Sequence, residues 1–192
     1  MKTQAITLVS LFFGSCIIAG AVFYTRNGFP WFRGQLPNCV AYHSGTVKVD
    51  MRYPNEFVVL KYPTLFQVYR QSGSDISRPA NESPLLSIDN FGIYVPVERL
   101  ISESETEPGP RPSKVIVNGH DAALAQFDGS TSSSPMSRYE IPIGNRVIRL
   151  DSRRSSLASD SQRQLFDKMF RSITFTQVGE DVKMPRVEQC GS

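Results

Sequence analysis

The sequence predicts an α+β domain, with a mainly antiparallel β-sheet and packed helices, preceded by one N-terminal transmembrane helix. Short apolar stretches recur along the chain and are separated by turn-forming residues, which is typical of strands. Asn118-Gly119 and Gly144-Asn145 lie between such stretches and are typical of hairpin turns. One strongly amphipathic helix comes late, after Ser159. Hairpins followed by a single clear helix favour an antiparallel sheet.

The N-terminal segment is apolar enough to span a membrane. Residues 5–24 include fifteen apolar residues out of twenty, and no charged residue lies between Lys2 and Arg26. Twenty helical residues extend about 30 Å, the thickness of a bilayer core. The apolar part of a signal peptide is usually shorter. We therefore expect residues 1–25 to be an uncleaved anchor through which the protein contacts the membrane.

Two alternatives for this segment stay open. Ala19-Gly20-Ala21 fits the small-residue pattern of a signal-peptide cleavage site. Phe13–Cys16 is similar to the lipobox at which bacterial lipoproteins are lipidated on the cysteine, here Cys16. Basic residues flank the segment almost equally and set no orientation. The remainder has no second apolar span, so we expect a single-pass cell-membrane protein whose C-terminal domain lies outside the cytoplasm.

The rest of the chain is predicted to form one domain with irregular ends. Residues 26–45 contain Gly and Pro without periodicity and are predicted to be a linker. The extracytoplasmic domain is predicted at residues 46–178, followed by a polar tail at 179–192. Within the domain, residues 102–113 combine Glu and Pro and are expected to be a mobile acidic insertion.

The predicted strands are short and differ in pattern. Residues 46–53 alternate apolar and polar side chains, as in a strand with one buried face. Pro63 ends the next strand, and the turn-forming residues 71–84 are predicted to be a loop. The full set of predicted strands is 46–53, 57–62, 66–70, 85–88, 91–95, 114–117, 122–127, 137–142, 146–152 and 173–177.

The helix after Ser159 has a recognisable start and one apolar face. Ser159 with Gln162 three residues later forms a capping box. Asp160 in the first turn and basic residues in the last complement the helix dipole. Its apolar residues recur at helical spacing and should face the core: Leu165, Phe166, Met169, Phe170 and Ile173.

Four segments in this order resemble a known family. They are Phe57–Pro63 (FVVLKYP), Val115–Ala122 (VIVNGHDA), Tyr139–Asn145 (YEIPIGN) and Phe166–Phe175 (FDKMFRSITF). Over residues 46–177 the chain is similar to the PsbP-like domains of bacterial membrane-anchored proteins and lipoproteins. The resemblance implies an antiparallel sheet with helices packed around it. It also implies a binding or assembly accessory without a catalytic residue.

The sequence lacks the common catalytic and cofactor-binding motifs. It contains no G-x-S-x-G, Walker loop, G-x-G-x-x-G or C-x-x-C, so we expect no cofactor. Only two histidines are present, which leaves little for a metal site. A calcium site formed by Glu103, Glu105 and Glu107 is an alternative interpretation, but an alternating acidic stretch is more typical of a solvated loop. The alternative function is a cell-envelope hydrolase that uses His120 with a nearby Asp or Ser, such as Asp121, Ser155 or Ser156.

The densest basic stretch contains four arginines: Arg146, Arg149, Arg153 and Arg154. Guanidinium groups suit phosphate and other anions, so these residues are a candidate anion site. The plainer interpretation is a solvated strand end paired with Asp151 or Asp160. No nucleic acid is expected as a partner, because the net charge is only +3 and no aromatic residue lies among these arginines.

Cys39 and Cys190 lie at the two ends of the domain. An exported domain meets oxidising conditions in which the two cysteines can form a disulfide. Together, these observations predict a membrane-tethered, non-catalytic binding or assembly accessory that meets an envelope protein partner of unknown identity.

Overall fold

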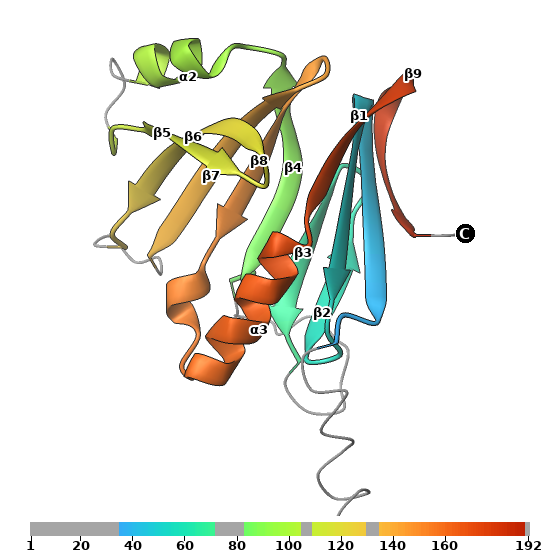
Figure 1. Cartoon of the computed structure of the whole chain (residues 1–192), viewed down its shortest axis with the longest axis vertical. Coiled ribbons are helices and arrows are strands. Elements are labelled where there is room, and N and C mark those ends of the chain that lie inside the picture. Colours follow the sequence, from blue (N-terminus) through green and yellow to red (C-terminus); the bar gives the residue numbers. More distant parts are fainter. Residues whose placement is uncertain (1–34, 72–82, 105–108, 130–134, 191–192) are drawn as a thin grey trace, which may run out of the picture. The chain divides into compact units, whose positions relative to one another are not determined.

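The computed structural model describes residues 35–71, 83–104, 109–129 and 135–190 (Figure 1). The predicted anchor at residues 1–25, with its alternatives for cleavage and for lipidation of Cys16, lies outside these ranges. None of the helices in the described ranges is long and apolar enough to cross a membrane.

Most of the described chain forms an antiparallel sheet. Within the described ranges, seven strands are ordered β2-β3-β4-β8-β7-β6-β5, and every neighbouring pair is antiparallel. The α+β class with a mainly antiparallel sheet is therefore confirmed. The strands are β2 (Phe57–Lys61), β3 (Leu65–Arg70), β4 (Leu86–Ile93), β5 (Ser113–Val117), β6 (His120–Phe127), β7 (Met136–Ile143) and β8 (Arg146–Ser152).

A second, two-stranded sheet joins the ends of the domain. It pairs β1 (Asn38–Tyr53) with β9 (Thr174–Gln189) in antiparallel orientation. A sixteen-residue strand would extend about 50 Å if straight. Nevertheless, Asn38 Nδ2 donates to Asn55 Oδ1 at 2.8 Å, so β1 must fold back on itself. Figure 1 shows β9 making the matching turn at its upper end before it descends to the C-terminus.

The fold-back is centred on Gly45. The pairing register shifts on both sides of this residue, and its φ of +59° lies in the left-handed region that favours glycine. An added Cβ there would overlap the Asn145 side chain and lie 2.5 Å from Nε of Arg146. Asn145 Oδ1 also accepts hydrogen bonds from the Thr46 amide and hydroxyl at 2.9 and 3.1 Å. The β7–β8 turn therefore fixes the bend in β1.

The hydrophobic core lies on one face of the seven-stranded sheet. Strand side chains alternate between faces, and Ile88, Ile148 and Leu150 are fully buried on the core side. β1 and the helix α3 (Asp160–Arg171) cover them. The neighbouring residues Asp89 and Arg149 consequently point to the opposite, outer face of the sheet.

The predicted late helix is confirmed as α3. The Ser159 side chain accepts a hydrogen bond from the Gln162 amide, and Phe166 and Met169 are buried. The predicted hairpin turn caps the other end, because Asn118 Nδ2 donates to the carbonyls of Phe170 and Ile173 at 3.0 and 2.9 Å. A short 3₁₀ helix, η2 (Arg154–Ser156), precedes α3.

The predicted acidic insertion is wrong at its start. Residues 102–104 belong to the helix α2 (Val97–Ser104), which packs on the outer face of the sheet. Val97 and Leu100 are buried against Ala123 and Val147. The sequence signal was weak because this short helix buries only two side chains, and its other positions are polar except for the partly buried Ile101.

The predicted linker and tail are corrected in the same way. β1 begins at Asn38 rather than at residue 46, and β9 continues to Gln189 rather than ending near residue 177. The outer half of β9 is mostly polar and exposed, whereas residues 40–45 of β1 are buried. A third correction concerns Asp89-Asn90, where β4 continues with only a register shift in place of the predicted turn.

Candidate ligand-binding pocket

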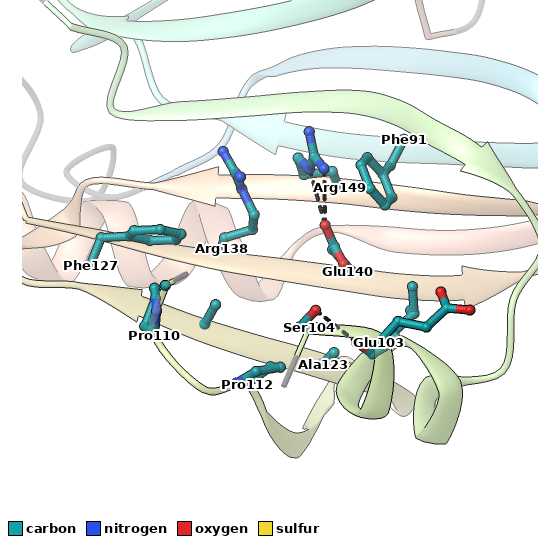
Figure 2. Close-up of a pocket in the computed structure, with 13 residues that line it drawn as sticks. Phe91, Glu103, Ser104, Pro110, Pro112, Ala123, Phe127, Arg138, Glu140 and Arg149 are labelled. Carbon is teal, nitrogen blue, oxygen red and sulfur yellow. Dashed lines mark hydrogen bonds and ion pairs between the residues drawn. The ribbon is translucent and has the colours of Figure 1, made fainter. Parts of the chain in front are cut away.

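A pocket of about 550 Å³ opens on the outer face of the seven-stranded sheet (Figure 2). Ala123 and Ala125 of β6 line its floor, and their small side chains leave space beside the long side chains of β7 and β8. α2 covers one end of this face and contributes Leu100 to the wall. The remaining lining residues are Phe91, Glu103, Ser104, Gly109, Pro110, Pro112, Phe127, Arg138, Glu140 and Arg149.

Two arginine–carboxylate pairs cross the strands on this face. Arg149 of β8 donates through Nε and Nη2 to Oε1 of Glu140 on β7, at 3.3 and 3.0 Å. Arg138 of β7 donates to both carboxylate oxygens of Asp151 on β8, at 2.8 and 3.0 Å. Both pairs are cross-strand partners in the ladder, so the register of β7 and β8 fixes their geometry.

A third carboxylate extends the cluster onto β4. Asp89 lies directly opposite Arg149 in the β4–β8 ladder. Burial raises the pKa of Asp89, and the nearby Arg149 opposes that shift. Oδ1 of Asp89 is buried without a hydrogen-bond partner. The cluster thus has three carboxyl groups for two guanidinium groups, and any excess charge is negative.

An aromatic ring packs against each of the two guanidinium groups. The Arg149 guanidinium lies 3.7 Å from the centroid of the Phe91 ring, and that of Arg138 lies 5.4 Å from the Phe127 ring. Such contacts are favourable cation–π interactions. Figure 2 shows each arginine between its ring and the centre of the sheet face. Each guanidinium is therefore fixed by one carboxylate and one ring before any ligand arrives.

The four arginines predicted as an anion site do not form one patch. Arg149 joins the pocket, whereas Arg154 pairs with Asp167 of α3 through Nε and Nη2, the latter at 2.8 Å. Arg153 donates to the Pro84 carbonyl at 3.2 Å, and Arg146 lies beside the fold-back at Gly45. The plainer interpretation had named Asp151 and Asp160 as partners, but the structure pairs these residues with Arg138 and Arg163.

The residues of the alternative hydrolase are not brought together. His120 is the first residue of β6 and contacts the Phe175 ring edge-on, with centroids 5.2 Å apart. Ser155 Oγ donates to the Pro135 carbonyl, next to the β7 residue that pairs with the last residue of β6. Eight strand residues, about 24 Å, separate the two ends. Asp121, next to His120, pairs with Lys114 at 2.9 Å.

Cys39 and Cys190 are joined as a disulfide in the structure, with Cα atoms 5.4 Å apart, a usual separation for this bond. They continue the β1–β9 register that begins with Val40 opposite Gln189. Among the described residues, Asp50 and these two cysteines form a group close enough for a metal ion. However, bonded sulfur atoms are poor metal ligands, since the thiolate is the form that binds.

The calcium alternative is only partly covered by the structure. Glu103 lies on α2 and pairs with Arg99 at 2.6 Å, while Glu105 and Glu107 lie outside the described residues.

Few features of the sequence predict this pocket. Arg138, Glu140 and Phe91 look like ordinary strand residues in isolation. The useful signal was the alternation of charged with apolar side chains in β7 and β8, which places several charges on one sheet face. Strand register decides which arginine pairs with which carboxylate. The sequence of a single strand does not contain that information.

No known protein family matches this chain, and no curated protein matches it. A crystal structure of a protein from Bacteroides thetaiotaomicron VPI-5482 aligns with a TM-score of 0.42 and 12% identity, over 72% of this chain. The alignment covers 51% of that protein, so this chain spans about half of its length. The likeness is too weak to inform function.

Proposed function

We propose that the protein is a membrane-tethered extracytoplasmic binding module of the PsbP-like kind, without catalytic activity. The pocket between α2 and strands β6–β8 carries this proposal. Its charged groups are already paired across strands and braced by aromatic rings, as described above. A site prepared in this way can hold a ligand without rearranging, and such preorganisation reduces the cost of binding.

The residues that line the pocket also favour ligand binding over catalysis. Catalysis by a nucleophile needs a base within hydrogen-bond reach of it. Among the described lining residues, Ser104 is the one with a hydroxyl, and it donates to the Leu100 carbonyl of its own helix at 2.8 Å. The arginine-bound carboxylates are acceptors in fixed pairs, which suits recognition.

The disulfide supports the extracytoplasmic location. Structural disulfides persist in oxidising compartments and are rare in the cytosol. Residues 5–24 supply the proposed tether, from their apolar composition alone. A Lys168→Cys variant tests this location, because Lys168 is exposed on α3. We expect a membrane-impermeant maleimide to label it on intact cells, and labelling only after lysis would contradict export.

The binding role is tested with a photoreactive residue placed in the full-length protein in its membrane. We expect a photoreactive group at Ala125, on the pocket floor, to give a covalent adduct detectable by intact mass. The same group at Lys168, on the exposed surface of α3, serves as the control and should give none. Equal adducts at both positions, or none at Ala125, would contradict a binding role for the pocket.

A further inference from the structure

We propose that this pocket binds a small neutral polyhydroxylated ligand, of the chemical class of sugars. The inference rests on the proposed binding role and adds the ligand class. Three properties of the lining support it: arginines that are already paired with carboxylates, further donor and acceptor positions beside those pairs, and apolar surfaces at the walls.

A charged ligand would compete with the ion pairs already formed in this pocket. An anion reaching Arg149 or Arg138 would either compete with Glu140 or Asp151, each already bonded through two contacts, or bind at Nη1 beside these carboxylates and be repelled by them. The displaced carboxylate would remain beside the partly buried Asp89, adding negative charge to a cluster that already has an excess of carboxyl groups. A cation would have to compete with the arginines for the same carboxylates. A neutral ligand avoids both costs.

The pairs still offer hydrogen bonds to such a ligand. A guanidinium has five N–H donors, and a carboxylate has about four lone-pair positions. Arg149 uses Nε and Nη2 on Oε1 of Glu140, so neither its Nη1 nor Oε2 of Glu140 takes part in that pair. Arg138 likewise leaves Nη1 outside its pair with Asp151. A hydroxyl group both donates and accepts, so neighbouring hydroxyls match this mixture of donors and acceptors.

The walls of the pocket provide apolar surfaces that suit the C–H faces of a sugar ring. Phe91, Phe127, Pro110 and Pro112 line the pocket around the charged centre. A sugar ring carries hydroxyls at its rim and C–H groups on its faces, so it presents polar and apolar surfaces at once. The volume of about 550 Å³ falls within the usual range for small-molecule sites.

The position of the pocket makes an extended peptide the weaker candidate. Peptides that join a sheet do so at an exposed edge, through backbone hydrogen bonds. Here the floor is formed by β6, β7 and β8, each of which is paired on both sides. The face consequently presents side chains and no free strand edge.

The test uses the full-length protein in a detergent without a sugar headgroup, because a glycoside detergent would compete. Titration calorimetry is performed with maltose, cellobiose and N,N′-diacetylchitobiose. The charged comparison set is glucuronate, glucose 6-phosphate and glucosamine. We expect at least one neutral disaccharide to bind, and the charged sugars to bind about tenfold more weakly or not at all.

Variants connect the binding to the pocket. Ala125→Phe fills the floor while it leaves both ion pairs in place, and we expect it to abolish binding. Glu140→Gln removes a charged acceptor and should weaken binding about tenfold. Asp167→Asn breaks the ion pair with Arg154 on α3 and serves as a matched control that keeps full affinity. Thermal melts establish that each variant is folded.

The outcomes separate the ligand class from the binding role. Preferred binding of a charged sugar, or neutral-sugar binding that survives Ala125→Phe in a folded protein, overturns the proposed class. If no sugar binds but the photoreactive group at Ala125 still gives its adduct, the ligand class is wrong and the binding role stands. If neither is observed, both proposals fall.

Discussion

Removal of the disulfide should destabilise the domain substantially. The change is the double substitution Cys39→Ser with Cys190→Ser, which leaves no unpaired thiol at the site. The two cysteines are 151 residues apart in sequence, so the bond constrains almost the whole described chain. Loop-closure entropy for that separation gives a stabilisation of about 5 kcal/mol, by restricting the unfolded chain.

The measured effect should be smaller than this figure. Unfolded chains keep some residual compactness, and disulfides typically contribute about 2–4 kcal/mol. In the folded state, residues 40–43 pair with 186–189, so the ribbon itself holds the two ends together without the bond. The native structure should therefore survive the substitution. We expect a loss of about 3–4 kcal/mol and, for a domain of this size, a fall in Tm of roughly 10 °C.

The assay compares urea unfolding of the oxidised protein, the reduced protein and the double variant. Reduction should lower the midpoint to that of the double variant, and a Cys16→Ser variant should match the oxidised protein. Alkylation followed by intact mass must show that reductant exposes two further thiols, out of three cysteines in the sequence. An unchanged midpoint in the double variant, with the bond verified in the parent protein, would refute the entropic reasoning.

Three further predictions concern stability, each measured by thermal or urea unfolding. Ser159→Ala removes the helix cap and should cost about 1 kcal/mol, whereas Ser159→Asn should keep most of it. Gly45→Ala should cost roughly 2 kcal/mol more than Gly119→Ala, because both have positive φ but only Gly45 lacks room for a Cβ. Burial raises the pKa of Asp89 in the folded state, so the protonated carboxyl favours the folded state at pH values below the usual Asp pKa. This contribution to stability is lost as the pH rises through the folded-state pKa. Asp89→Asn should therefore be more stable than the parent at neutral pH and equal to it below about pH 4, while Asp151→Asn should be less stable at neutral pH.

The strands that the sequence predicted well have both an alternating pattern and a defined turn. β7 and β8 are examples, because Gly144-Asn145 sets their register and apolar residues mark the core face. α3 was equally clear, since its cap and apolar face agree. The outer halves of β1 and β9 were missed because their stability comes from pairing between the two ends of the domain. A local pattern does not contain a contact between residues about 150 positions apart.

The site was harder to predict for a related reason. The sequence pointed to four arginines close together in the chain, but neighbouring strand residues face opposite sides of a sheet. Only Arg149 among them reaches the pocket. Its partners come from β4 and β7, and the space itself depends on two alanines of β6 that carry no chemical signal. Disulfide pairing was easier to anticipate, because only Cys39 and Cys190 lie in the predicted soluble part.

The two sides of the pocket differ in how firmly the fold holds them. The floor belongs to three strands that are paired on both sides and tied by two ion pairs, so its geometry should change little. The α2 wall is an eight-residue helix that buries only Val97 and Leu100. A short helix has little stability of its own and depends on such packing. Substitutions on the floor should therefore alter which ligand is accepted, whereas shortening Leu100 should weaken every ligand similarly, because it loosens the wall without changing the polar groups.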